Sequence, residues 1–438
     1  MTTPTYNWDQ LVEAGRVQAS VYTDPRIFEL EMQRIFERTW VYVGHESQVP
    51  NVGDYYATQI GRHPVVMVRT QSGEIAVLRN RCAHKGAQIV GNRSGNVKAF
   101  RCGYHGWCYR LDGTRLAIPA SAGYDGTCFG RDSTDARMAP AARVDVYRGF
   151  VFASLAASGP ALPEWLGGAR LSIDNMVDRS PQGALEVTGV TLRQELNANW
   201  KFHVENLNDL MHPMVAHQSA SQAGRKVADE RYPNGASVPA EIQIIAPFTN
   251  NYAFFDEMGV TALEHGHSYS GGRVSIHSAY SDIPEYQAAL EQAYGAERTR
   301  EILVVNRHNT VVYPSLTLKG AIQTVRVVRP LAVDRTLIES WTFRLKGAPQ
   351  ALLRRSVLYC TLINSSAGVI QPDDHEAYIR MQSALQGESP GWVSMHRYPG
   401  KETAVPEEGG RRAPGTSDIV FRNQFAAWKE LMRQERPA

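Results

Sequence analysis

Two short segments of the chain each pair one cysteine with one histidine. Cys82 and His84 are two positions apart, Cys102 and His105 are three apart, and seventeen residues lie between the pairs. Thiolate and neutral imidazole are both good ligands for zinc and iron, so these four residues could hold one tetrahedral zinc ion or a cluster of two irons and two sulfides. In such a cluster one iron takes both cysteines and the other takes both histidines, and the centre passes one electron at a time.

The spacing favours the iron–sulfur cluster over zinc. Zinc ribbons and fingers usually carry two cysteines in one loop, as C-x2-C, whereas here each loop supplies one cysteine and one histidine. Gly86, Gly103 and Gly106 allow the backbone to turn around a bulky group. Because short β-runs flank both segments, we expect the two pairs at the tips of two β-hairpins. The other cysteines are expected to be small core residues, with the first of them the nearest alternative ligand: Cys108, Cys128 and Cys360.

A second group of ligand-capable side chains lies within residues 199–217. Glu205, Asp209 and His212 are spaced i, i+4 and i+7, so they would share one face of a helix. The proline after His212 is expected to keep it out of the α region and to interrupt the helix, so that His217 converges with His212 on one metal ion. Two histidines and one carboxylate on one side of an iron leave its other positions open for oxygen and substrate. The alternative is a polar helix whose histidines and aspartate only bond to each other.

Elsewhere, apolar periodicity and turn residues indicate two regions. A chain of 438 residues exceeds what one core comfortably holds. Short β-runs separated by Gly and Asn turns extend from about residue 42 to residue 155, and the Gly- and Pro-rich stretch 159–168 is typical of a linker. Beyond it, strands and helices alternate as in an antiparallel sheet with packed helices. The expected strands are 63–70, 75–80, 144–154, 185–192, 242–246, 323–329 and 337–345, and the expected helices are 24–40, 199–216, 285–294, 352–363 and 423–434.

Together, the motifs resemble those of the large (α) subunits of Rieske non-haem iron aromatic ring-hydroxylating oxygenases. Segments 81–87 and 102–107 are similar to the loops of Rieske oxygenases and Rieske ferredoxins. Segment 205–217 fills every position of the family's Glu-Asn-x-x-Asp-x-x-His-x4-His stretch. Respiratory Rieske proteins differ, since they carry an additional cysteine in each loop and a membrane anchor. The resemblance spans nearly the whole chain.

The resemblance implies an α+β fold of two domains. Residues 42–156 would form an all-β Rieske [2Fe-2S] domain, and residues 1–41 with 157–438 a mononuclear iron catalytic domain. The catalytic domain would be an antiparallel sheet with helices, of the helix-grip or START-like type. Cys82, His84, Cys102 and His105 would then bind the cluster.

It also implies a third iron ligand, a carboxylate that follows a glycine-containing turn by about six residues. Asp374 has this place, and Asp373 is its nearest alternative, because Gln371 and Pro372 depart from the family's usual residues before the pair. The iron ligands would be His212, His217 and Asp374. His375 and His203 are expected to lie outside the ligand set.

Asp209 has a different role in the resemblance. In the family, the equivalent aspartate connects the mononuclear site of one subunit to a Rieske histidine of its neighbour, so electrons cross the subunit interface. Asp209 would therefore link His212 to His105, or otherwise to His84, of the next chain. That arrangement implies a homotrimer, commonly with a small β subunit.

The implied activity is that of the terminal oxygenase of a multicomponent ring-hydroxylating dioxygenase. One [2Fe-2S] cluster and one mononuclear Fe(2+) per subunit would use O2 to hydroxylate an aromatic substrate, with aromatic acids among the candidates. NADH or NADPH would act through a separate reductase, with or without a ferredoxin, because the chain has no Gly-x-Gly-x-x-Gly after a strand. The alternatives are a Rieske monooxygenase or demethylase and, in another class, a non-catalytic Rieske electron-transfer or ligand-binding protein.

Composition argues against several partners. The chain has 43% hydrophobic and 21% charged residues with a net charge of +2, which gives no strong field for nucleic acid or an anionic membrane. No run of eighteen apolar residues and no leader-like N-terminus is present, so we expect a cytoplasmic protein.

Several further residues could contact the substrate. Arg307, His308 and Asn309 lie between apolar runs and could meet a carboxylate. The candidate pocket walls are Asn206, Leu207, Leu210, Phe254, Phe255, Val304, Val305 and Val312.

Overall fold

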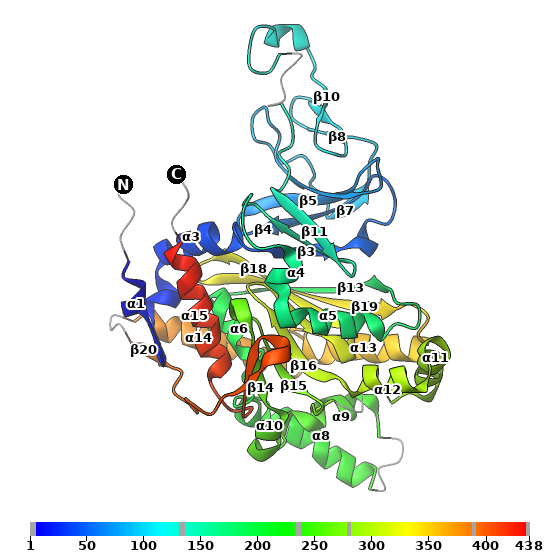
Figure 1. The fold of residues 1–438 in the computed structure, drawn as a ribbon, viewed down its shortest axis with the longest axis vertical. Helices are drawn as coiled ribbons and strands as arrows, with labels where there is room; N and C mark the ends of the chain where they lie inside the picture. Colours follow the sequence, from blue (N-terminus) through cyan, green and yellow to red (C-terminus); the bar gives the residue numbers. More distant parts are fainter. Residues whose placement is uncertain (1–5, 131–135, 234–237, 278–281, 388–390, 435–438) are drawn as a thin grey trace. The chain divides into compact units, whose positions relative to one another are not determined.

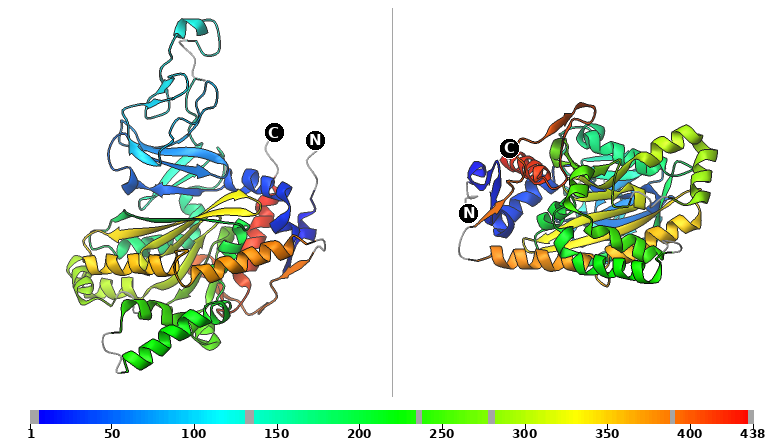
Figure 2. Two further views of the ribbon diagram at one scale, coloured as in Figure 1. Left: turned by 180° about the vertical axis from the view of Figure 1, so that it is seen from behind. Right: turned by 90° about the horizontal axis from the view of Figure 1, so that it is seen from below.

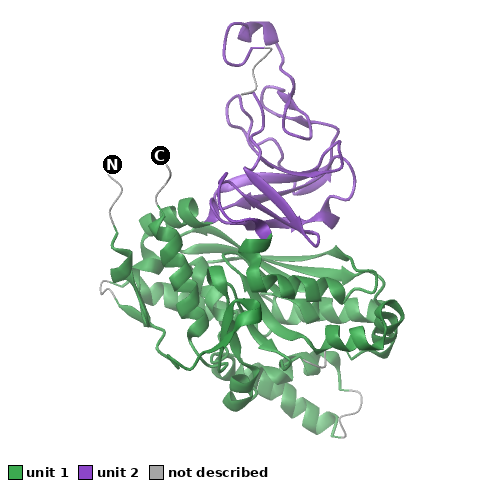
Figure 3. Cartoon of the chain, in the orientation of Figure 1, with its two compact units in different colours: residues 1–35, 163–438 green, residues 36–162 purple. Residues whose placement is uncertain are grey.

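The computed structural model describes residues 6–130, 136–233, 238–277, 282–387 and 391–434. The chain divides into two compact units, one of residues 36–162 and one of residues 1–35 with 163–438 (Figure 3).

The unit of residues 36–162 consists mainly of short antiparallel strands in three sheets (Figure 1). The sheet orders are β6-β5-β4-β7, β11-β12-β3 and β10-β9-β8. The strands are β3 Val41–His45, β4 Asp54–Ile60, β5 His63–Arg69, β6 Ile75–Arg79, β7 Ser94–Asn96, β8 Phe100–Arg101, β9 Cys108–Tyr109, β10 Arg115–Ala117, β11 Arg143–Tyr147 and β12 Phe150–Ser154. The expected run 144–154 is thus a hairpin of two strands.

The two cysteine–histidine segments are loops of different kinds. The second loop is the tip of a hairpin, because β8 and β9 on either side of it pair directly. The first loop follows β6 and leads to β7, and these strands lie at opposite edges of their sheet, so the expectation of two hairpin tips is wrong for it. Cys82 and Cys102 both lie in the hydrophobic core of this unit, which also contains Leu78.

The other unit is built on a nine-stranded antiparallel sheet of order β13-β19-β18-β17-β16-β15-β14-β22-β21 (Figures 1 and 2). Its strands are β13 Leu185–Leu196, β14 Val260–Ala262, β15 Ser268–Gly272, β16 Asn306–Val312, β17 Leu316–Lys319, β18 Thr324–Ala332, β19 Arg335–Leu345, β21 Thr403–Val405 and β22 Gly410–Ala413. A small sheet is formed by β1 Val12–Glu13, β2 Arg16–Gln18 and β20 Trp392–Ser394. Strands β17 and β18 are almost wholly buried on both faces, which indicates covering elements on each side.

Helices cover this sheet. In the ribbon views, α13 and α14 lie along one face and α5 along the other; contacts join α13 to β19, α6 to β18 and α5 to β17 (Figures 1 and 2). The helices are α1 Trp8–Leu11, α2 Ser20–Thr23, α3 Pro25–Glu31, α4 Leu162–Leu166, α5 Arg170–Asp178, α6 Trp200–Asn206, α7 Pro213–Ala216, α8 Gln218–Arg231, α9 Ala240–Ile245, α10 Tyr252–Met258, α11 Pro284–Tyr294, α12 Ala296–Val304, α13 Gln350–Ile363, α14 Gln371–Leu385 and α15 Ile419–Arg433. None of the helices in the described ranges combines the length and apolar character needed to cross a membrane.

Local signals explain most of these elements, and tertiary packing explains the exceptions. Asp24 caps α3 by accepting from the Arg26 N–H, as expected, but α3 ends at Glu31 and continues as a π-helical turn over Met32–Phe36 instead of reaching residue 40. The expected strand 242–246 is helix α9: its β-branched residues favour a strand locally, but Ile244 is buried in a cluster with residues of α13.

Candidate metal centres

The two cysteine–histidine loops have the same pattern of backbone hydrogen bonds. In the first loop, the Cys82 N–H donates to the Ala87 carbonyl at 2.8 Å and the Gly86 N–H donates to the Cys82 carbonyl at 3.0 Å. The second loop repeats both bonds at the same lengths, from the N–H groups of Cys102 and Gly106. Gly86 and Gly106 have φ of 77° and 73°, a left-handed conformation that favours glycine. The equivalent turns present one cysteine and one histidine each.

The side chains of these loops gather in one place. The rings of His84 and His105 are 4.6 Å apart between centroids, and the Trp107 ring stacks on His84 at 4.8 Å. The Tyr124 hydroxyl lies 3.4 Å from Nε2 of His84. The other ring nitrogen, Nδ1 of His84, is buried and has no hydrogen-bond partner among the described residues. An unsatisfied buried nitrogen is costly, and a metal ion would satisfy it.

The donor set fits an iron–sulfur cluster. The Tyr109 hydroxyl accepts a bond from the Ala83 N–H at 3.1 Å, which leaves its proton to donate toward Sγ of Cys82 at 3.0 Å. Such a bond stabilises a thiolate, the form that binds metal. One tetrahedral zinc ion would need the ligand atoms of all four loop side chains close together. Among the described residues, these four side chains do not form a group whose ligand atoms all lie within 4.8 Å of one another. Of the other cysteines, only Cys360 is the buried core residue expected; Cys108 is half-buried and Cys128 exposed.

The second constellation lies beyond the end of a buried helix. Helix α6 begins at the Asn199 cap, whose side chain accepts from the Lys201 N–H, and it ends at Asn206. Residues 207–212 form turns, so Glu205 and Asp209 do not share one helical face. The expected effect of the proline on His212 is also wrong: His212 is in the α region, with φ −62° and ψ −33°, and α7 starts directly after it. His217 then stands between α7 and α8.

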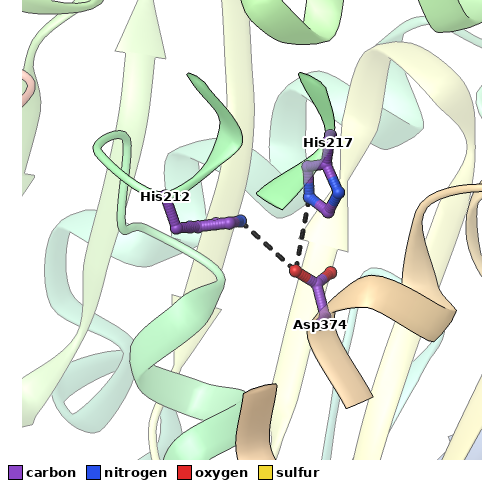
Figure 4. A group of neighbouring side chains, drawn as sticks. All are labelled: His212, His217 and Asp374. Carbon is purple, nitrogen blue, oxygen red and sulfur yellow. Dashed lines mark ion pairs between the residues drawn. The ribbon is translucent and has the colours of Figure 1, made fainter. Parts of the chain in front are cut away.

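Three side chains converge at this point (Figure 4). One carboxylate oxygen of Asp374, Oδ1, is 3.4 Å from Nε2 of His212 and 3.3 Å from Nε2 of His217. The ligand-capable atoms of the three residues all lie within 4.8 Å of one another. Two imidazoles and one carboxylate in this arrangement fit the facial triad of non-haem iron(II) oxygenases.

Each histidine has a second carboxylate behind it. Nδ1 of His217 lies 3.3 Å from Oδ2 of Asp373, and Nδ1 of His212 lies 3.7 Å from Oδ2 of Asp209. The Met211 N–H donates to the other Asp209 oxygen at 2.8 Å and holds that side chain in place. Such outer carboxylates orient metal-binding histidines and leave Nε2 free for the metal.

Electrostatics at the three residues favours a cation. Burial alone would raise the pKa of Asp374, but hydrogen bonds and charge interactions with His212 and His217 outweigh it and hold the pKa well below its usual range. Burial would lower the pKa of His212, yet the carboxylates of Asp209 and Asp374 raise it to about 10. This concentration of negative charge around two imidazoles is suited to a divalent ion.

Neighbouring titratable groups have other partners. Glu205 accepts a bond from the Tyr22 hydroxyl at 3.0 Å, and burial raises its pKa to about 8. His375 contacts the Gln371 amide at 2.8 Å. His203 is buried beside Tyr378, and burial lowers its pKa well below the usual range. None of these belongs to the convergent group.

A cavity of ≈ 50 Å³ opens beside the three converging residues. Its lining residues are Asn206, Leu207, Asp209, Leu210, His212, Pro213, His217, Phe248, Phe255, Met258, Ile276, His308, Asn309, Lys319, Arg326, Ile363, Ile370 and Asp374. Half of the expected pocket walls are among them, while Phe254, Val304, Val305 and Val312 are not. Of the residues expected to meet a carboxylate, His308 and Asn309 line the cavity, but Arg307 pairs with Glu408 at 2.7 Å. The sequence analysis did not identify Lys319 and Arg326 as lining residues. Their positions inside otherwise apolar strands could have indicated that these cations are buried.

Comparison with known proteins agrees with this geometry. Residues 39–135 match the family described as Rieske [2Fe-2S] domain, and residues 162–412 the one described as ring hydroxylating alpha subunit (catalytic domain). Toluate 1,2-dioxygenase subunit alpha from Pseudomonas putida is 34% identical over 97% of this chain and 94% of its own length. Biphenyl dioxygenase subunit alpha from Metapseudomonas furukawaii is 31% identical over 96% of this chain and 92% of its own. The chain belongs to the ring-hydroxylating oxygenase α-subunit family.

Solved structures show the same fold. A structure of naphthalene 1,2-dioxygenase with indole in its active site has a TM-score of 0.81 at 21% identity, covering 99% of this chain and 95% of that one. A quaternary ammonium Rieske monooxygenase matches with a TM-score of 0.65 at 16% identity. The expected α+β fold is thereby confirmed. As a member of this family, the chain is a Rieske non-haem iron oxygenase whose cofactors are a [2Fe-2S] cluster and a mononuclear iron.

Proposed function

We propose that this chain is the terminal oxygenase subunit of a multicomponent dioxygenase that hydroxylates an aromatic substrate. The observation that carries the proposal is the convergence of two histidines and one aspartate on the wall of a cavity that also has apolar walls. In this proposal the iron ligands are His212, His217 and Asp374, and the cluster ligands are Cys82, His84, Cys102 and His105. When bound by these residues, the cluster would supply single electrons and the mononuclear iron would supply the site for O2 activation.

The surrounding residues have two tasks in this chemistry. Asp373 lies 3.3 Å from Nδ1 of His217 and accepts its proton, which fixes the tautomer with Nε2 facing Asp374. Asp209 lies 3.7 Å from Nδ1 of His212, and its charge favours the same orientation of that ring. Leu207, Phe255 and the other apolar walls bind a ring and exclude water from the space beside the ligands.

Asp209 also serves as the route for electrons into the catalytic site. Its carboxylate lies behind His212, and 26% of its side chain is exposed, so a group from another chain can reach it. His105 is exposed, whereas His84 is half-buried against Trp107, so His105 of a neighbouring subunit is the proposed partner. This route requires an oligomer in which each chain completes the next, and the proposed assembly is a homotrimer, with or without a small β subunit.

Substituting Asp209 tests this route. In Asp209→Ala, both metal centres should stay filled while product formation with the reductase falls by about 10- to 100-fold, since outer residues of metal sites have effects of this size. The measurements are iron content, the visible spectrum of the cluster and product per electron consumed. In a single turnover, the reduced cluster should also reoxidise more slowly.

Glu205→Gln is the matched control, because Glu205 lies four positions earlier but bonds to Tyr22 instead of a histidine. It should keep coupled turnover. An Asp209→Ala enzyme with full iron and full product would remove Asp209 from the electron route.

The remaining partners follow from the need for two electrons per turnover. A separate reductase supplies them from NADH or NADPH, directly or through a ferredoxin, in the cytoplasm where these nucleotides are regenerated. Analytical ultracentrifugation of the purified chain, alone and with a candidate β subunit, tests the assembly. Isotopic oxygen tests the reaction: two labelled atoms in the product support dioxygenation, and one indicates the monooxygenase or demethylase alternative.

A further inference from the structure

Two cations lie in the wall of the catalytic cavity, where most other residues are apolar. Lys319 ends β17 and Arg326 lies in β18, and only 5% and 8% of these residues are exposed. Both line the same cavity as Asp374. Lys and Arg are almost never this buried unless they are paired with an anion, because removing a charge from water is costly.

Among the residues that the structure describes, Lys319 forms hydrogen bonds only with neutral groups. Its ammonium donates to the Tyr359 hydroxyl at 2.7 Å and to Nε2 of His308 at 3.1 Å. It also lies 5.1 Å from the centre of the Tyr359 ring. These contacts orient the ammonium but leave its charge without an anionic partner, and burial together with the charge of Arg326 lowers the pKa of Lys319 well below its usual range.

Arg326 is also held by a neutral group. Its Nη2 donates to Oδ1 of Asn309 at 3.0 Å, and the amide nitrogen of Asn309 donates to the Leu207 carbonyl. The pairing of β16, β17 and β18 puts Asn309 and Arg326 on the same face of the sheet, since Val311 is opposite Thr317 and Thr317 is opposite Arg326. The guanidinium has five N–H donors, so most of its capacity remains for a ligand.

Two other cations of the sheet do have a carboxylate partner. Arg329, three residues further along β18, pairs with Glu339 at 3.4 Å, and Arg307 on β16 pairs with Glu408 at 2.7 Å. Within the described ranges, neither Lys319 nor Arg326 has a carboxylate within ion-pair distance. Asp374 attracts both charges from further away, but its Oδ1 lies between two histidines.

We propose that Lys319 and Arg326 bind the carboxylate of the substrate, so that this oxygenase acts on aromatic acids. The inference rests on the proposed function and adds the substrate class. A carboxylate would neutralise the cation pair and accept N–H bonds from both side chains, which is the strongest kind of hydrogen bond available to it. The apolar walls, including Leu210 and Phe248, would contact the ring in the same cavity as the iron ligands. A hydrocarbon substrate would leave both buried charges unpaired.

The names of the relatives do not make this choice. Of the two relatives compared, one is named for an aromatic acid, toluate, and the other for a hydrocarbon, biphenyl. The assignment of an acid instead of a hydrocarbon therefore rests on Lys319 and Arg326 alone.

The test compares benzoate with benzamide, a neutral molecule of nearly the same shape. The iron-replete holoenzyme is assayed for kcat/KM with its reductase, and dissociation constants are measured by calorimetry without turnover. In the wild type, benzoate should be strongly preferred. Arg326→Met and Lys319→Met should each lower kcat/KM and affinity for benzoate by about 10- to 100-fold, the size of a hydrogen bond to a charged group. Benzamide should change by less than about threefold, and Arg326→Lys should retain part of the preference for benzoate.

Arg307→Met is the matched control, since it removes an arginine of the same sheet that already has a carboxylate partner. It should leave the ratio of benzoate to benzamide unchanged. Equal wild-type use of the two probes, or equal losses for both in Arg326→Met and Lys319→Met, would overturn the carboxylate site. Cluster spectra and iron content show whether each variant is folded. If the methionine variants do not fold, the wild-type affinities for benzoate and benzamide still test the carboxylate site. An iron-replete enzyme that hydroxylates neither of the two probes nor toluene would instead contradict the proposed function.

Discussion

At the scale of single residues, two adjacent aspartates have different surroundings because successive helix positions point about 100° apart. Asp373 and Asp374 both lie in the first turn of α14. Asp374 faces Nε2 of both histidines, whereas Asp373 faces Nδ1 of His217 from outside the cavity. The geometry therefore supports Asp374 as the ligand, although the spacing in the sequence left both open.

We expect Asp374→Asn to lose the mononuclear iron, because an amide neither carries the negative charge nor competes with carboxylate as an iron(II) ligand. Total iron should fall from about three to about two atoms per chain, with the cluster spectrum unchanged. Asp373→Asn should keep the iron and lose activity by about 10- to 100-fold. Iron analysis of both variants checks this assignment, and iron loss only in the Asp373 variant would reverse it.

At the scale of elements, helix α6 is held in place by one buried carboxylate. Glu31, at the end of α3, accepts bonds from Lys201 at 2.6 Å, from the Trp200 indole at 2.8 Å and from the Trp428 indole of α15 at 2.7 Å. Glu31 and Lys201 are both fully buried. Three helices thus meet at one charge pair, and α6 leads directly to Asn206 at the edge of the cavity.

Glu31→Ala should lower the free energy of unfolding by about 3–5 kcal/mol, because it leaves the Lys201 charge buried without a partner. The double variant Glu31→Ala with Lys201→Met should recover much of the loss, since it removes both charges. Denaturant unfolding of the single and double variants measures the difference. If the double variant is no more stable than Glu31→Ala, the charge pair is not the source of the effect.

At the scale of the whole molecule, buried neutral histidines make stability depend on pH. Nε2–H of His267 donates to the Trp165 carbonyl at 2.8 Å, and the Tyr313 N–H donates to its Nδ1 at 2.9 Å, so both nitrogens are used only in the neutral form. Burial lowers the pKa of His267 to about 3. Burial lowers the pKa of His277 to about 3 as well.

The sign of the effect follows from proton binding. An unfolded histidine has a pKa of about 6.5, so below that pH the unfolded chain binds a proton that folded His267 does not. Each such histidine should reduce stability as pH falls from 6.5 toward 3, by up to about 1.4 kcal/mol per pH unit. His267→Gln should be less stable at pH 7.5 but should lose less stability between pH 7.5 and 5. Unfolding midpoints at the two pH values check this, and an unchanged difference would contradict it.

How much of this was predictable depends on the range over which each signal acts. The α+β class and most helices and long strands followed from apolar periodicity, caps and turns, as for α3, whose Asp24–Pro25 start is a local signal. The end of α6 at Asn206 and the helical form of α9 did not follow, and for α9 the reason is the burial of Ile244 against α13. Sequence patterns also predict the four cluster residues, His212 and His217 as ligands, because ligand types and spacing lie within short segments, and these assignments stay predictions.

The sequence alone therefore determined the kind of chemistry: a Rieske-type cysteine–histidine pattern and a second motif rich in His and carboxylates, whose joint presence indicated a two-centre iron oxygenase. Only the tertiary structure distinguished Asp374 from Asp373, removed Arg307 from the cavity and brought Lys319 and Arg326 into it. The physical reason is that a ligand motif is local, whereas the partner of a buried charge is set by which distant strands and helices pack around it. Those packed elements, not the motifs, point to an acid as the substrate.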